Sequence, residues 1–161
     1  MQAISFQPIG IIHSGHLQPE GTPIQFLGAK EFKGEIEIFA EFKEGLADLD
    51  GFSHLMLIYY FHQIKNVSLS VKPFMDEAAH GVFATRSPAR PNPIGFSIVR
   101  LLEIRGTRLL IEGLDILNET PLLDLKPYVP QFDAVDAEKI GWLETNIEKH
   151  WKTKDDGRFT T

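Results

Sequence analysis

Short apolar segments separated by turn residues constrain the fold more than any other feature of this sequence. Residues 3–12 carry few charges, and residues 35–42 alternate charged and apolar side chains. Such alternation is typical of strands, because successive side chains point to opposite faces. Further strands are predicted at 55–61, 67–72, 96–104 and 108–114, each short and bounded by Gly, Pro or Asn. The pattern predicts a mainly β protein.

One helix is expected, near the C-terminal end. Ile140, Leu143, Ile147 and Trp151 recur at spacings of three and four residues, with charged residues between them. The polar residues 152–161 are expected to fray. Since 161 residues match the size of one domain, we expect residues 1–135 to form the main domain and 136–161 a C-terminal helix and tail of the same unit.

Composition excludes several kinds of chemistry. The sequence contains no cysteine, which rules out disulfides, thiolate zinc sites and cysteine nucleophiles. Its six histidines are scattered without close ligand spacing, so no metal site is predicted. No apolar run approaches the roughly 20 residues of a membrane span, and no secretory leader is evident, so we expect a cytoplasmic protein without a membrane segment. The net charge of -6 means that a nucleic-acid partner would need a local basic patch.

The segment from Ser14 to Gly34 is predicted to be a functional loop. It contains four Gly and two Pro in 21 residues and shows no sustained periodicity. Loops of this length within a compact domain are often functional. We therefore expect ligand contacts there.

A stiff loop with arginines is the most unusual stretch. Three prolines lie within residues 88–93, and Arg86 and Arg90 precede and interrupt them. Proline restricts the backbone before any ligand binds, which lowers the entropic cost of binding. The guanidinium groups suit a carboxylate or phosphate, and Asn92 suits an adenine edge or an amide. A rigid surface turn with solvated arginines is the alternative interpretation.

Residues 81–95, Gly-Val-Phe-Ala-Thr-Arg-Ser-Pro-Ala-Arg-Pro-Asn-Pro-Ile-Gly, resemble the signature of the TrmO family. These are S-adenosylmethionine-dependent methyltransferases that act on N6-threonylcarbamoyladenosine in tRNA. Four further motifs occur in the family's order, at residues 51–55, 61–63, 114–121 and 124–130. The resemblance covers roughly residues 5–133 and is therefore specific.

The resemblance implies a fold and partners that periodicity alone does not give. It implies a single-sheeted, TsaA-like β-barrel that forms a homodimer, with S-adenosylmethionine bound near the subunit boundary and tRNA as the substrate. A Rossmann-type methyltransferase is not indicated, since no Gly-x-Gly-x-x-Gly sequence follows a strand and opens a helix.

The family's motifs also imply site residues. The implied cofactor contacts are Pro23, Ile24, Gln25, His62, Gln63, Arg86, Phe96, Leu114, Asp115, Ile116, Leu117 and Asn118. The implied substrate contacts are Arg86, Arg90, Asn92, Lys126 and Tyr128. The set suits a cofactor with an adenine, a ribose, a sulfonium and a carboxylate, each of which needs its own kind of polar partner.

Methyl transfer to N6 requires loss of a proton, for which Asp115, His62 and Tyr128 are the candidate acceptors. The sequence does not choose among them. Asp115 is also a common turn residue, and the aromatic residues before His62 are also typical of a core.

The sequence departs from the family at one corner. Asn118-Glu119-Thr120-Pro121 replaces the usual Asp-Gly-Thr-Pro, so Glu119 must adopt a different turn or a strained one. Longer family members also carry an extra C-terminal domain, which we do not expect in this protein. Two other function classes therefore stay open, namely a noncatalytic module that binds S-adenosylmethionine or a nucleotide, and a methyltransferase of a small amide or peptide.

Overall fold

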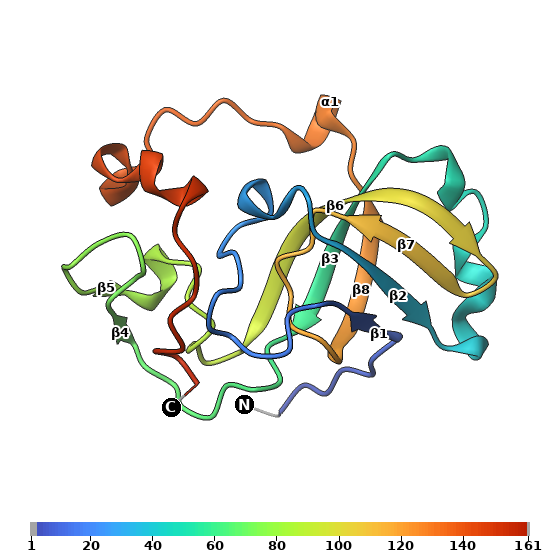
Figure 1. Cartoon of the computed structure of the whole chain (residues 1–161), viewed down its shortest axis with the longest axis horizontal. Helices are drawn as coiled ribbons and strands as arrows, with labels where there is room; N and C mark the ends of the chain where they lie inside the picture. Colours follow the sequence, from blue (N-terminus) through green and yellow to red (C-terminus); the bar gives the residue numbers. More distant parts are fainter. Residues whose placement is uncertain (1–2, 161) are drawn as a thin grey trace.

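Six antiparallel strands close into a barrel in the computed structural model, which describes residues 3–160 (Figure 1). Around the barrel the order is β1-β2-β7-β6-β3-β8. The bounds are β1 Gly10–His13, β2 Lys33–Ile38, β3 His54–Tyr60, β6 Ile94–Arg105, β7 Arg108–Glu112 and β8 Thr120–Pro127. The mainly β barrel expected from the sequence is confirmed.

Alternation along the strands fills the barrel. In β3, Leu55, Leu57 and Tyr59 point inward and are 5% exposed or less, while their neighbours face out. The core is otherwise aliphatic, and its fully buried members include Ile12, Ile36, Leu109, Ile111, Leu114, Leu122 and Val99. Because these side chains fill the interior, it is a packed core and not a channel. Burial of each side chain contributes roughly 1.5–3 kcal/mol to stability.

Several strands differ in extent from their predicted ranges. β1 begins only at Gly10, and β2 ends at Ile38 because Ala40–Leu46 forms the 3-10 helix η2. Only Ser70–Val71 of the predicted 67–72 strand pairs, as β4 with β5, which is His80–Gly81. The remaining short elements before residue 135 are η1 Phe26–Ala29, η3 Leu49–Gly51, η4 Val82–Ala84 and α1 Pro130–Asp133.

The C-terminal segment differs most from expectation. In place of one helix it forms two 3-10 helices, η5 Gly141–Thr145 and η6 Ile147–Trp151, separated at Asn146. The predicted fraying of residues 152–160 is wrong, because Lys154 forms a β-bridge with Pro23 and the segment runs between β4 and the 14–34 loop (Figure 1). Within residues 3–160, no helix combines the length and apolar character that crossing a bilayer requires.

Candidate functional site

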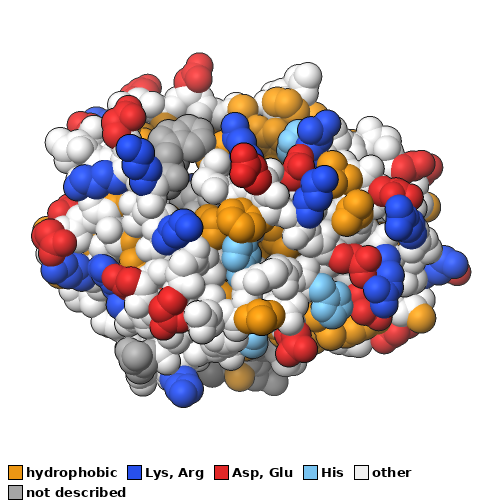
Figure 2. All heavy atoms as spheres, viewed as in Figure 1, with side chains coloured by type: hydrophobic (Ala, Val, Ile, Leu, Met, Phe, Trp, Pro, Cys, Tyr) orange, Lys and Arg blue, Asp and Glu red, His pale blue; other side chains and the backbone are white. Residues whose placement is uncertain are grey.

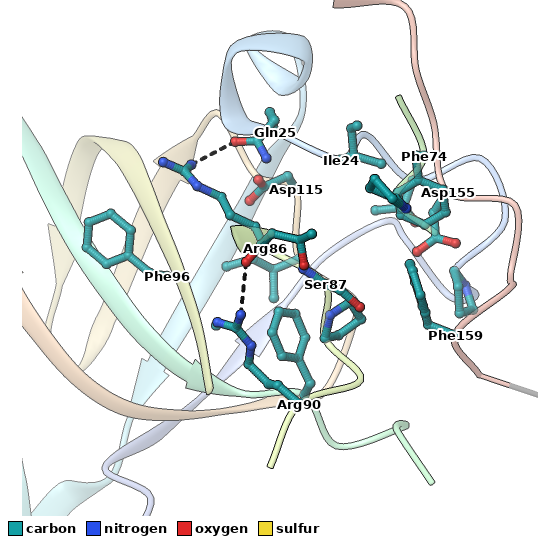
Figure 3. Close-up of a pocket in the computed structure, with 18 of the residues that line it drawn as sticks. Ile24, Gln25, Phe74, Arg86, Ser87, Arg90, Phe96, Asp115, Asp155 and Phe159 are labelled. Atoms are coloured by element: carbon teal, nitrogen blue, oxygen red, sulfur yellow. Dashed lines mark hydrogen bonds between the residues drawn. The ribbon is translucent and has the colours of Figure 1, made fainter. Parts of the chain in front are cut away.

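A cavity of about 1020 Å³ opens where β3 ends and β6 and β8 begin. Its walls come from the 14–34 loop, from the stiff loop of residues 86–93 (the arginine loop), from the segment after β7 and from the C-terminal segment. Eleven of the predicted site residues line it: Pro23, Ile24, Gln25, His62, Gln63, Arg86, Arg90, Phe96, Asp115, Ile116 and Leu117. Figure 3 shows Gln25, Arg86 and Asp115 gathered together on one side of it.

Leu114 and Asn118 lie outside the cavity lining although their neighbours form it. Leu114 is fully buried in the barrel core. The Asn118 side chain turns toward the 14–34 loop, where Oδ1 accepts a hydrogen bond from the Ser14 N–H at 3.0 Å. The Asn118 N–H donates to the His16 carbonyl at 2.8 Å. The side chains of Leu114 and Asn118 therefore support the cavity wall, and their contact with the cofactor stays a prediction.

Asn92, Lys126 and Tyr128 are also absent from the cavity lining. Because β8 runs antiparallel to β3, its start lies at the cavity and its end, at Pro127, pairs with Leu55. Tyr128 follows there, with its N–H bonded to the His54 carbonyl at 3.0 Å. The length of β3 separates it from the cavity by roughly 20 Å. Lys126 pairs with Asp124 at 2.7 Å.

A hydrogen-bonded carboxylate forms the floor of the cavity. Asp115 Oδ1 accepts a hydrogen bond from Ser97 Oγ at 2.7 Å. Ser97 Oγ lies 3.3 Å from the Tyr59 hydroxyl, which must donate because the serine proton goes to Asp115. Burial raises the pKa of Asp115 to about 6, although the bond from Ser97 opposes the shift. Burial also raises the pKa of Tyr59, and the charge of Asp115 adds to that shift. The floor therefore holds a proton acceptor that titrates near neutrality.

Arg86 supplies the cation at the cavity rim. Its Nη1 donates to Gln25 Oε1 at 2.9 Å, which ties the arginine loop to the 14–34 loop. A guanidinium has five N–H donors, so further donors are available to a ligand carboxylate.

Arg90 holds the arginine loop in shape. Its Nη2 donates to the carbonyls of Val82 and Thr85, at 3.0 and 2.9 Å. These bonds fix the turn that carries Arg86. The Arg90 side chain thus lines the cavity and also holds the loop backbone in place. The sequence did not predict this structural role.

His62 lies at the end of β3 and is a neutral imidazole near pH 7. Its Nδ1 lies 3.3 Å from Thr120 Oγ1, whose own proton is donated to the Leu117 carbonyl. Nδ1 must therefore donate, which leaves Nε2 as the acceptor. Burial lowers the pKa of His62, and the charge of Glu119 opposes that shift.

The unpredicted residues of the cavity wall include Tyr59, Phe74, Asp155 and Phe159, and Ser97, just outside the lining, was not predicted either. Ser97 contributes through its bond to Asp115. Tyr59 follows Leu55 and Leu57 at alternate positions, so the period of two already places its hydroxyl inside the barrel. Nothing in the local sequence indicates that the C-terminal segment reaches the cavity.

Comparison with known proteins finds a family model over most of the chain. Residues 11–134 match the tRNA-methyltransferase O N-terminal domain. The chain is 56% identical over 156 residues to a "Probable S-adenosyl-L-methionine-binding protein" of Pyrococcus abyssi, covering 97% of this chain and 85% of that protein.

More distant relatives carry more specific names. The human tRNA (adenine(37)-N6)-methyltransferase is 33% identical over 154 residues, which cover 91% of this chain and 35% of the human protein. The crystal structure of TrmO from Pseudomonas aeruginosa superposes with a TM-score of 0.73 at 38% identity, covering 88% of this chain and 63% of that one. The chain thus spans less than two thirds of both proteins.

Proposed function

The chain belongs to the TrmO family of S-adenosylmethionine-dependent tRNA methyltransferases, and we propose that it methylates N6 of threonylcarbamoyladenosine beside the anticodon. The observation that carries the proposal is the Asp115 carboxylate on the floor of a large cavity, with the Arg86 cation beside it (Figure 3). We include a cytoplasmic location in the proposal.

The cavity suits the cofactor in its size and its polar groups. Arg86 offers a bidentate partner for an amino-acid carboxylate. Phe61 and Phe96 offer aromatic faces, and Phe96 is 50% exposed, so its ring is open to a ligand. Bound S-adenosylmethionine supplies an electrophilic methyl group. The volume exceeds that of most drug-sized sites, which leaves room for an acceptor base beside the cofactor.

Asp115 is the best-placed acceptor for the N6 proton. It lines the cavity, and its oxygen is oriented by Ser97, which is in turn oriented by Tyr59. A pKa of about 6 keeps the group ionised at pH 7 while leaving it basic enough to take a proton. His62 Nε2 is a second acceptor in the same cavity. Positioning of the acceptor nitrogen supplies the rest of the catalysis.

Binding of tRNA must rely on local charge. On the face shown in Figure 2, Lys and Arg side chains are interspersed with Asp and Glu and form no extended basic area. With a net charge of -6, phosphate contacts therefore have to come from a few local basic residues. A homodimer would double the number of such contacts, and we include dimerisation in the proposal.

The test is methyl transfer in vitro, followed by mass spectrometry of the nucleosides. Purified protein and S-adenosylmethionine are incubated with tRNA that carries threonylcarbamoyladenosine and, as a control, with the same tRNA lacking the threonylcarbamoyl group. We expect a mass gain of one methyl group only on the modified adenosine. Since general bases contribute 10²–10⁴-fold, Asp115→Asn should lower kcat by about 100-fold while leaving cofactor affinity within a few-fold.

Two outcomes would contradict the proposal. Cofactor binding without any methyl transfer to tRNA indicates a noncatalytic binding module. Methyl transfer to an added small amide or peptide, with none to either tRNA, indicates a small amide or peptide substrate.

A further inference from the structure

The C-terminal segment, residues 141–160, forms one side of the cavity although it lies beyond the matched family domain, residues 11–134. Trp142, Leu143, Ile147, Asp155, Phe159 and Thr160 contribute to the lining from this segment. Figure 3 shows Asp155 and Phe159 gathered with Phe74 and Ile24 on the side away from Phe96 and Arg86.

Hydrogen bonds fix this segment to three parts of the cavity wall. The Trp142 Nε1–H donates to the Ala84 carbonyl at 2.8 Å, next to the arginine loop. The Asp155 N–H donates to the Thr22 carbonyl at 2.9 Å, and the Gly21 N–H donates to the Asp155 carbonyl at 2.8 Å. Arg158 Nη1 donates to the Pro73 carbonyl at 3.2 Å. The segment is therefore a built wall of the cavity.

Two phenylalanines form the apolar part of this wall. The rings of Phe74 and Phe159 meet edge to face, with centroids 5.1 Å apart. The Arg158 guanidinium lies 4.9 Å from the centroid of the Phe74 ring. Gly157, at φ +82°, makes the turn that returns the chain toward Phe74, a conformation that other residues rarely adopt. The aromatic pair is thus held in place before any ligand binds.

A carboxylate lies beside the aromatic pair. Asp155 Oδ1 accepts a hydrogen bond from the Gly157 N–H at 2.7 Å. No group within residues 3–160 donates a hydrogen bond to Asp155 Oδ2, so this oxygen is available to a ligand in the cavity. Burial raises the pKa of Asp155, and Asp156 and Glu20 add to the shift.

We propose that Phe74, Phe159 and the Asp155 carboxylate form a subsite for the adenine ring of the cofactor. A planar ring gains stacking energy on an aromatic face, and its exocyclic amine donates to a carboxylate. Arg86, on the opposite side of the same cavity, suits the carboxylate at the other end of the same ligand. The inference rests on the proposed function, because it takes S-adenosylmethionine as the ligand.

Calorimetry with S-adenosylhomocysteine and with adenosine, in the absence of tRNA, tests the subsite without turnover. Asp155→Asn keeps the acceptor for the Gly157 N–H but loses the charge, and we expect about 10-fold weaker binding of both ligands. Phe159→Ala removes the aromatic face, with an expected loss of about 10-fold. Lys152→Ala, an exposed change in the same segment, is the matched control and should bind like the wild type.

Three results would overturn the subsite. Wild-type affinity for both ligands in Asp155→Asn and Phe159→Ala contradicts it directly. If both ligands bind these variants as they bind the wild type, while a separate titration with tRNA is weakened, the aromatic wall takes the acceptor base and not the cofactor. If the wild-type protein itself binds neither ligand, the cofactor assignment fails, and the subsite fails with it. Thermal unfolding followed by circular dichroism identifies any variant that has lost its fold.

Discussion

Asp115 is charged at neutral pH at the expense of folding stability. Its pKa is about 6 in the folded protein, against an ordinary value of 3.8. Between these values the folded state holds a proton that the unfolded state has lost. Stability contributed by this group is therefore greatest below about pH 4 and falls as the pH rises to about 6. A buried carboxylate retained despite this penalty is typical of functional sites.

Asp115→Asn should abolish this pH dependence, because the amide does not titrate. Relative to the wild type, the free energy of unfolding of the variant should rise by about 2 to 3 kcal/mol between pH 4 and pH 7. Urea denaturation at pH 4, 5, 6 and 7 measures the difference. A constant gap between the two proteins across this range would show that Asp115 has an ordinary pKa.

Glu119 occupies the strained turn that its sequence context suggested. Its φ is 61°, in the left-handed region that favours glycine. Glu119→Gly should therefore raise the free energy of unfolding, by up to about 1 kcal/mol, since the relief of strain exceeds the entropy that glycine adds to the unfolded chain. Glu119→Gln keeps the strain and serves as the control. Equal stability of the two variants would show that the turn carries no strain.

The family's motifs name Asp115 on the cavity floor, but neither its hydrogen-bond partner Ser97 nor the aromatic side of the cavity. Gln25, Arg86 and Asp115 belong to contiguous motifs, so the resemblance alone named them as site residues, and all three line the cavity. Ser97 looks like any small strand residue until folding brings it 2.7 Å from Asp115. Phe159 reaches Phe74 only through a tail whose polar composition predicted disorder.

At the level of elements, prediction succeeded for short apolar segments bounded by turn residues, as in β3, β6 and β7. Each of these strands is also paired with a neighbouring strand on both sides. β8 was not predicted, because Pro121, Asp124 and Lys126 are residue types that are uncommon in strands. The segment is nevertheless a strand, since β1 and β3 supply its hydrogen-bonding partners. Residues 3–9 lie outside any strand because pairing, and not propensity, decides where β1 begins.

The predicted C-terminal helix failed for a local reason. Spacings of three and four residues match the 3.6 residues per turn of an α-helix, whereas 3.0 residues per turn spread the same side chains around a 3-10 helix. Gly141, at φ 60°, begins η5, and Asn146, at φ −120°, separates η5 from η6.

The attachment of this segment predicts a pattern of hydrogen exchange. Arg158→Ala removes the bond to the Pro73 carbonyl and the cation above Phe74. Exchange should therefore speed up in residues 153–160 and 19–23, and stay unchanged in the barrel strands. Arg105→Ala, which removes an exposed pair with Glu103, is the control. Equal exchange of residues 153–160 in both variants would show that Arg158 does not secure the segment.

At the scale of the whole molecule, Tyr128 and Lys126 have a place in the reaction only if a second subunit is present. Both lie at the end of the barrel opposite the cavity of their own chain. In a twofold dimer each protomer presents the same surfaces to the other, so one subunit's far end can face the other's cavity. Their role in substrate binding or proton transfer stays a prediction.

We expect a homodimer at micromolar concentration. Light scattering coupled to size-exclusion chromatography should give twice the 18.2 kDa chain mass. If the dimer completes the active site, dilution below its dissociation constant should reduce methyl transfer per subunit. A monomer mass throughout the micromolar range would remove both the dimer and any role for Tyr128.

Closure of the barrel also determines the order in which the chain can fold. β1 pairs with β8, which is the last strand to be synthesised. Until residues 120–127 have left the ribosome, β1 and β3 each expose an unpaired edge able to join another chain. Pairing between such distant segments is slow, because loop closure precedes any gain in contact energy. Protection of the nascent chain by chaperones is therefore most needed just before β8 emerges.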